Sequence, residues 1–166
     1  DYRVYTMKRS REGKRILVGS RHHGTEWRER DYKRLGRFTG HHGHAVPSIA
    51  YCRDPNMILT GSRDGSIRRW DRHRPGKYLA RWWPHQGHVR RMRVSPDGQW
   101  VLSYGNGLLI ETSVVDGSPR IEWDRHQGPV EAVAWLPSGE RVVSGSSDGT
   151  LRVWNAAMGK TVRIID

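Results

Sequence analysis

An eleven-residue segment occurs twice in this chain, as GSSDGTLRVWN at residues 145–155 and as GSRDGSIRRWD at residues 61–71. Both copies place an Asp-Gly pair between a run of small residues and a segment that alternates toward Trp. Gly tolerates positive φ and Asp can bond back to its own backbone, so the pair predicts a tight β-hairpin. The recurrence of the same hairpin at two distant places in one chain indicates an internal repeat.

The repeat extends over four copies of a longer unit. The copies start at Val4, Val46, Val89 and Val130, which gives a nearly constant spacing of about 42 residues. Apolar residues recur three and twelve positions after each start, and Gly or Pro stands nine positions after it. A glycine or proline at a fixed position marks a turn. The copies are predicted at about residues 1–40, 41–84, 85–124 and 125–166.

Each copy is predicted to form four short antiparallel strands. In the last copy, the second strand corresponds to RVVSGS (141–146), the third to TLRVWN (150–155) and the fourth to TVRIID (161–166). A single sheet cannot bury both faces, whereas sheets stacked around an axis can. The predicted fold is therefore all-β, with four β-propeller blades that form part of a ring or half of a dimeric ring.

The unit resembles the WD-repeat (WD40) family. HQGPVEAVAWLPSGERVVSGSSDGTLRVWN at residues 126–155 is close to the family pattern. The resemblance covers essentially the whole chain, and it is strong in the second and fourth copies, fair in the third and weak in the first. It implies four-stranded blades, usually seven or eight to a ring, and a role as an interaction platform.

The resemblance also implies a chain of hydrogen bonds within each blade. It runs from a His before the first strand, through a Ser or Thr on the second, to a Trp on the third, and the turn Asp orients the His. Such a chain supplies partners for polar atoms that are costly to bury alone. The matching residues of the fourth copy are His126, Ser144, Asp148 and Trp154. Those of the second copy are His41, Thr60, Asp64 and Trp70, with His42 as the alternative to His41.

The other two copies depart from this pattern. The third keeps His85 and Ser103, places Asn106-Gly107 at the turn and has Thr112 where Trp is expected. The first has no clear match, because Trp27 is out of place and His22-His23 replace Asp-Gly.

The His, Ser and Asp of one blade resemble a hydrolase triad in composition. The set recurs from blade to blade, however, whereas a catalytic triad is a single site. Neither a nucleophile elbow nor a phosphate-binding loop motif is present. HHGH at residues 41–44 has no Cys or carboxylate at metal-ligand spacing. We therefore expect a protein that is not an enzyme and has no cofactor and no metal site.

The net charge of +12 lies mainly in the first half of the chain. Residues 1–40 hold twelve Lys and Arg against five Asp and Glu, and residues 41–84 hold eight against three. Such an excess points to an acidic partner or a nucleic acid, or else only keeps strand surfaces solvated. The predicted basic patch consists of Arg68, Arg69, Arg72 and Arg74.

Other residues are candidates for contact with a protein partner. By the resemblance, Arg90 and Arg91 at the start of the third copy share one rim with Tyr5 and Glu131. Trp83 follows Trp82 directly, and neighbouring strand residues face opposite ways, so Trp83 is the candidate exposed aromatic.

These observations support three functions. The first is a non-catalytic scaffold or sensor platform for a protein partner. The alternatives are a basic module that associates with nucleic acid or a ribonucleoprotein complex, and a regulatory propeller segment of a larger multidomain protein. One cysteine predicts a reducing compartment such as the cytoplasm, and the apolar runs are too short for a membrane span. We expect further blades, or else homodimerisation, to complete the ring, with a closed four-bladed ring as the third choice.

Overall fold

The computed structural model of this chain describes residues 3–41, 43–105, 107–123 and 125–166, which form sixteen strands. The first two sheets contain β1 (Val4–Arg9), β2 (Arg15–Ser20), β3 (Gly24–Arg28), β4 (Arg34–Phe38), β5 (Ser48–Tyr51), β6 (Met57–Gly61), β7 (Ile67–Asp71) and β8 (Tyr78–Trp82). The last two contain β9 (Arg91–Val94), β10 (Trp100–Gly105), β11 (Leu108–Ser113), β12 (Pro119–Glu122), β13 (Val130–Trp135), β14 (Arg141–Ser146), β15 (Leu151–Asn155) and β16 (Lys160–Ile165). His42 and Asn106 lie outside the described residues.

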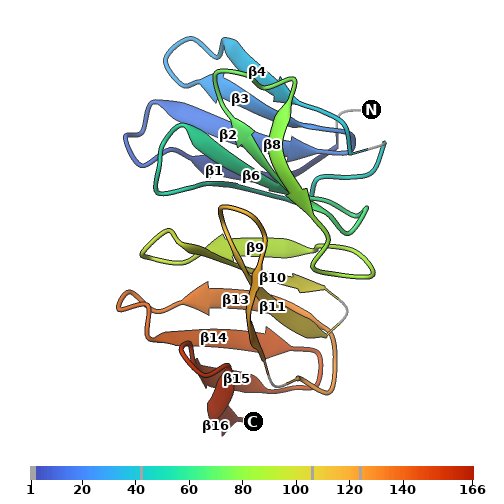
Figure 1. Cartoon of the computed structure of the whole chain (residues 1–166), viewed down its shortest axis with the longest axis vertical. Helices are drawn as coiled ribbons and strands as arrows, with labels where there is room; N and C mark the ends of the chain where they lie inside the picture. Colours follow the sequence, from blue (N-terminus) through green and yellow to red (C-terminus); the bar gives the residue numbers. More distant parts are fainter. Residues whose placement is uncertain (1–2, 42, 106, 124) are drawn as a thin grey trace.

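The four sheets succeed one another along the long axis of the molecule, from the blue N-terminal sheet to the red C-terminal sheet (Figure 1). Within each sheet the strands follow chain order, and every strand is antiparallel to its neighbour. The first strands of successive sheets adjoin, β1 with β5, β5 with β9 and β9 with β13. The prediction of an all-β chain of four-stranded blades is confirmed. The first and last sheets lie at opposite ends, so the four sheets do not close into a ring of their own.

The Asp-Gly hairpins form as predicted from the local sequence. Gly65 and Gly149 have φ of +83° and +87°, a backbone conformation that favours glycine. The carboxylate of Asp64 accepts a hydrogen bond from the backbone N–H of Ser66 at 2.8 Å. The carboxylate of Asp148 accepts from Thr150 in the same way at 3.0 Å. Each turn is thus stabilised by a hydrogen bond within its own hairpin.

Three apolar cores fill the seams between neighbouring sheets. In the first and third seams, an aromatic residue at the end of one sheet packs on the third-strand Trp of the next. The ring centroids of Phe38 and Trp70 are 5.6 Å apart, and those of Trp123 and Trp154 are 5.8 Å apart. Tilted aromatic pairs at such distances stabilise beyond the area that they bury.

The middle seam solves the same packing problem differently, because Thr112 stands where the other two seams have Trp. Trp82, the aromatic residue at the end of the second sheet, donates its indole N–H to the Thr112 hydroxyl at 3.1 Å. The Trp82 ring also fills the space beside Gly117, where an added Cβ would overlap the indole. The Trp82 indole therefore bonds to the small residue that the next sheet has at this position, in place of packing on a second indole.

The first sheet corrects one expectation from the sequence. Trp27 pairs across its sheet with Ile16, as Trp70 pairs with Ile58, so Trp27 is not misplaced. The prediction was wrong because Trp27 lies one position closer to the start of its repeat than Trp70 does. The shorter turn before Trp27 moves it in the sequence but not in the sheet.

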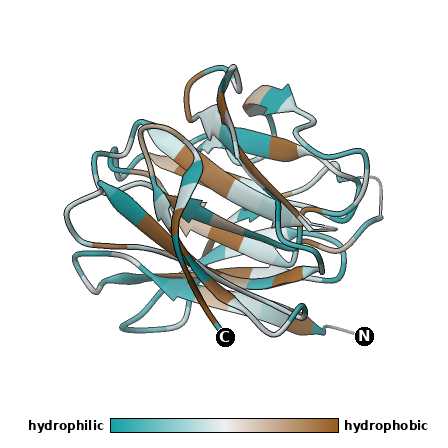
Figure 2. Cartoon of the chain, turned by 90° about the horizontal axis from the view of Figure 1, so that it is seen from below, coloured by the Kyte–Doolittle hydropathy of each residue, from teal (hydrophilic) through white to brown (hydrophobic). Residues whose placement is uncertain are grey.

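The outward faces of the two end sheets are partly apolar. In the fourth sheet Leu151 is 48% exposed and Ile165 is 42% exposed, and in the first sheet Met7 is 64% exposed. Figure 2 views the molecule from the end of the fourth sheet and shows hydrophobic colour along the strand that runs to the C-terminus. In the described part of the chain, no helix has the length and apolarity of a membrane span.

Candidate partner-binding site

The polar residues of the fourth sheet form a buried chain of hydrogen bonds. The indole N–H of Trp154 donates to the Ser144 hydroxyl at 2.7 Å, and Ser144 lies 2.6 Å from Nε2 of His126. Nδ1 of His126 lies 2.9 Å from the Asp148 carboxylate, which only accepts, so Nδ1 carries the proton. Desolvation alone would raise the pKa of Asp148, but hydrogen bonds from Thr150, His126 and Gln127 hold it well below its usual range.

The second sheet contains the same chain of hydrogen bonds, with Arg68 as an additional member. The Thr60 hydroxyl lies 2.8 Å from both Nε2 of His41 and Nε1 of Trp70, and Nδ1 of His41 lies 3.1 Å from Asp64. The guanidinium of Arg68 lies 3.2 Å from the same carboxylate, and Arg68 is only 1% exposed. Arg68 therefore belongs to the interior of the sheet, and the prediction that it contributes to a surface patch is wrong.

The third sheet contains only the His-to-Ser half of this chain of hydrogen bonds. Nε2 of His85 lies 3.0 Å from the Ser103 hydroxyl, and Thr112 replaces the Trp. Burial, partly opposed by a hydrogen bond with the Ser103 backbone, lowers the pKa of His85 to about 4, so its imidazole is neutral near pH 7. In all three sheets the hydroxyl groups are buried and already bonded.

The other arginines of the predicted basic patch differ in exposure. Arg72 lies 3.9 Å from Glu26 of the first sheet, and its side chain is 7% exposed. Arg69 is partly buried on β7, whereas Arg74 is exposed. The structure does not bring the four arginines together as one solvated surface, because alternate strand residues point into different seams.

Four of the five partner-contact candidates do come together. They line one pocket of about 330 Å³, which we call the rim pocket; its residues are Tyr5, Pro47, Arg63, His88, Arg90, Arg91, Tyr104 and Glu131. All four sheets contribute to it at the end where their first strands begin. Trp83 does not line it: it follows β8, is 57% exposed and has the Arg81 guanidinium 4.4 Å from its ring.

Contacts between sheets organise the rim pocket. The guanidinium groups of Arg3 and Arg63 lie 5.6 Å and 5.4 Å from the centre of the Tyr5 ring. Arg90 of the third sheet pairs with Glu131 of the fourth at 3.1 Å. Exposed pairs of this kind add little stability, so their main effect is to hold both side chains in place.

Two further contacts join the pocket to the backbone of neighbouring sheets. Arg91 donates to the carbonyl of Pro47 at 3.3 Å, and the Tyr104 hydroxyl donates to the carbonyl of Glu131 at 2.9 Å. Reasoning from the sequence missed Arg63, His88 and Tyr104. The first two could have been found from their positions, because Arg63 precedes the Asp-Gly turn and His88 precedes the start of a repeat.

Comparison with known proteins identifies the family. The pattern of the WD domain, G-beta repeat, matches residues 32–71, 76–110 and 117–155. The chain belongs to the WD40 repeat family. The crystal structure of the computationally designed Ika8 protein has the same fold, with a TM-score of 0.83 and 24% sequence identity, over 98% of this chain and 48% of that chain.

Several curated WD40-type relatives are longer than this chain. Eukaryotic translation initiation factor 3 subunit I of Eremothecium gossypii is 28% identical, over 96% of this chain and 51% of its own length. Protein LST8 homolog of Dictyostelium discoideum is 31% identical over 61% of this chain and 34% of its own length. WD repeat-containing protein 55 of Bos taurus is 26% identical over 88% and 38%. The chain thus spans about half or less of the length of these relatives.

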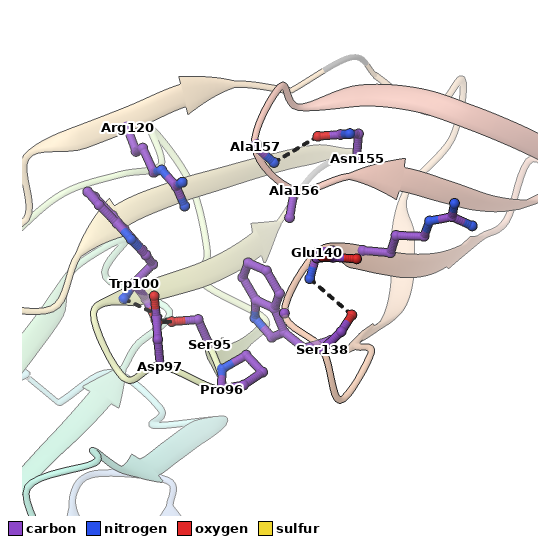
Figure 3. A pocket seen from close by; sticks show the side chains of 13 residues that line it. Ser95, Pro96, Asp97, Trp100, Arg120, Ser138, Glu140, Asn155, Ala156 and Ala157 are labelled. Atoms are coloured by element: carbon purple, nitrogen blue, oxygen red, sulfur yellow. Dashed lines mark hydrogen bonds between the residues drawn. The ribbon is translucent and has the colours of Figure 1, made fainter.

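The opposite rim of the WD40 sheets holds a second hollow, of about 480 Å³, between the third and fourth sheets (Figure 3). Its polar groups bond within their own turns: Ser95 with Asp97, Ser138 with Glu140, and Asn155 with Ala157. Arg120 lies 4.6 Å from the Trp100 ring and 3.4 Å from Glu111. Because this hollow lies between two sheets whereas the rim pocket is lined by all four, the rim pocket is the better candidate for a partner.

Proposed function

We propose that this WD40 chain is a non-catalytic scaffold that binds a protein partner at the rim pocket. The observation that carries the proposal is that one pocket is lined by residues from all four sheets. A partner seated there contacts every sheet at once, on a framework held by three packed seams. Binding sites of this kind need little rearrangement to form.

The names of two relatives support a role in an assembly. One is called a subunit of a translation initiation factor, and another, from Arabidopsis thaliana, is called a target of rapamycin complex subunit. We infer that this chain is likewise a subunit that contacts other proteins. The geometry of the His-Ser-Asp sets supports a structural role, since Ser144 is 1% exposed and its hydroxyl is already bonded.

Two further proposals concern how the ring is completed and in which compartment the chain resides. The exposed apolar residues of the end sheets support a ring completed by further blades of the same or a longer chain, with homodimerisation as the alternative. Either form accommodates the alternative of a regulatory segment in a multidomain protein. Cys52 is the single cysteine, and burial raises its pKa to about 12, which supports a packing role in a reducing compartment such as the cytoplasm.

The test of the scaffold function is partner capture with matched variants. Tyr5→Ala should reduce the amount of captured partner, because it removes the ring that Arg3 and Arg63 flank. The control is Ser138→Ala in the hollow of the opposite rim, which should leave capture unchanged. Circular dichroism and thermal unfolding verify that both variants are folded. Equal capture of the same proteins by Tyr5→Ala and by the unchanged chain would exclude the rim pocket as the partner site.

A further inference from the structure

The first strands of the four sheets differ in the size and charge of two side chains. Two and four positions after the repeat start, the first sheet has Thr6 and Lys8, and the third has Arg91 and Arg93. The corresponding residues of the other two sheets are all small: Ser48, Ala50, Ala132 and Ala134. Long cationic side chains therefore lie beside positions that leave them room.

These cations gather although they come from separate sheets. Lys8 is exposed on its strand; partial loss of its hydration is the first cause that lowers its pKa, and the charges of Arg93 and Arg91 lower it further. Lys8 belongs to β1 and the two arginines to β9, and β5, which adjoins both strands, has small residues at the corresponding positions. Arg63, Arg90 and Arg91 continue this positive charge into the rim pocket.

Little negative charge of the described residues faces this cluster. Glu131 is the acidic residue among the eight that line the rim pocket, and it is paired with Arg90 at 3.1 Å. Other carboxylates are engaged elsewhere: Asp64 and Asp148 with the buried histidines, and Glu26 and Glu111 in the seams. The cluster thus has a surplus of positive charge, which attracts an anionic partner.

The aromatic residues of the pocket distinguish between two kinds of anionic partner. Proteins that bind single-stranded nucleic acid stack bases on exposed aromatic rings. The Tyr5 ring already has two guanidinium groups beside it, at 5.4 Å and 5.6 Å, and Tyr104 is 2% exposed. The exposed ring among the described lining residues is then the small imidazole of His88, so the pocket provides mainly charge, which favours carboxylates over bases.

We infer that the rim pocket binds an acidic segment of a protein, whose Asp or Glu side chains pair with Arg63 and Arg91 and extend toward Lys8 and Arg93. This inference rests on the proposed scaffold function and specifies the chemistry of the partner. Arg90 is already neutralised by Glu131, so the main contacts fall on the arginines that have no carboxylate partner within the described part of the chain. Charge pairing of this kind gives a binding rate and affinity that fall with rising salt.

The test uses a defined probe, a fluorescein-labelled ten-residue peptide of alternating Glu and Gly, and measures its binding by fluorescence anisotropy. The same peptide with Gln in place of Glu should bind at least about tenfold more weakly at low salt. A five-nucleotide oligouridine is the comparison for nucleic acid, because its charge is similar. It should bind more weakly than the acidic peptide, since both tyrosines of the lining are flanked or buried and the small imidazole of His88 is the exposed ring left for stacking.

Matched charge reversals locate the binding site. The double variant R63E/R91E should weaken peptide binding about tenfold or more, because each change replaces attraction with repulsion. R141E/R163E makes the same change in net charge at exposed positions of the fourth sheet and should weaken binding less than about twofold. Lys8→Gln provides a milder second variant that should weaken binding without affecting the fold.

Three results of the binding assays with the peptide and oligouridine would overturn the inference. They are equal losses in the two double variants, tighter binding of oligouridine than of the acidic peptide, and peptide binding that does not depend on Glu. The first would mean that overall charge alone attracts the peptide, and the second that the pocket serves nucleic acid. If a captured partner is lost with Tyr5→Ala but retained with R63E/R91E, the scaffold function stands and the acidic chemistry is wrong.

Discussion

The indole of Trp82, at the end of the second sheet, donates a hydrogen bond to Thr112 on the third strand of the third sheet. The position of Thr112 corresponds to those of Trp70 and Trp154, as its pairing with Val101 shows. One indole thus fills the seam, where the neighbouring seams use two aromatic rings. Substitutions of Thr112 and Trp82 therefore test whether the two side chains share this seam.

Thr112→Trp restores the residue that the repeat leads one to expect, yet it should destabilise the protein by about 1–3 kcal/mol, because Trp82 already occupies the space. Trp82→Phe should reduce this cost, since Phe38 packs well on Trp70 at 5.6 Å in the first seam. Denaturant unfolding of both single variants and the double variant measures the coupling. Strictly additive free energies would show that the two side chains do not share the seam.

Removing parts of the hydrogen-bond chains should cost more where the chain is complete. Trp154→Ala should lower the free energy of unfolding by about 3–5 kcal/mol, because it leaves a large cavity and removes the indole donor to Ser144. His126→Ala should cost more than His85→Ala, since His126 bonds to both Ser144 and Asp148 whereas the bond of His85 is to Ser103. Equal losses for the two histidine variants, measured by chemical denaturation, would contradict this order.

The first sheet satisfies its tryptophan locally. Val18 takes the position of the Ser or Thr hydroxyl, and the Trp27 indole N–H donates instead to Thr25 on its own strand at 2.8 Å. Thr25→Val should lower the free energy of unfolding by about 1–3 kcal/mol, because it leaves the indole without an acceptor. Adding Val18→Thr to this variant should recover part of the loss by restoring the acceptor found in the other sheets. No recovery in thermal unfolding would indicate that Trp27 bonds to water instead.

His85 should make stability fall on mild acidification, in opposition to Glu26 and Glu111, whose pKa values burial raises. Burial lowers the pKa of His85 in the folded protein from 6.5 to about 4, so between these values the unfolded chain binds more protons. The contribution is fully present above about pH 6.5 and is lost as the pH falls toward 4, by an amount of ~3 kcal/mol. Urea unfolding at several pH values in this range measures the slope.

His85→Gln is the control for this pH dependence. It removes the titrating group, so the slope between about pH 6.5 and 4.5 should become shallower. His23, whose pKa burial and Arg37 also lower, remains in both proteins and cancels in the comparison. Asp64 and Asp148 have lowered pKa values and affect stability only at lower pH, where carboxylates titrate. An unchanged slope would mean that His85 becomes protonated without cost.

Much of the fold could be predicted from local sequence. The Asp-Gly turns, the near-constant repeat spacing and the alternation within strands act over a few residues, because turn chemistry and strand pleating are local properties of the backbone. The hydrogen-bond chain was predicted from the resemblance to the WD-repeat family, which implied the roles of His126, Ser144, Asp148 and Trp154.

Tertiary structure alone decided which residues meet across sheets. The bond of Trp82 to Thr112, the burial of Arg68 and the meeting of Arg63 with Tyr5 join residues of different sheets or bury them in seams. Nothing near these residues in the sequence encodes such contacts, because they depend on how two complete sheets pack at a particular angle and distance. The sequence by itself therefore determined the repeat and the inner order of each sheet. The packing of the sheets determined the seams, the interior position of Arg68 and the cationic rim pocket.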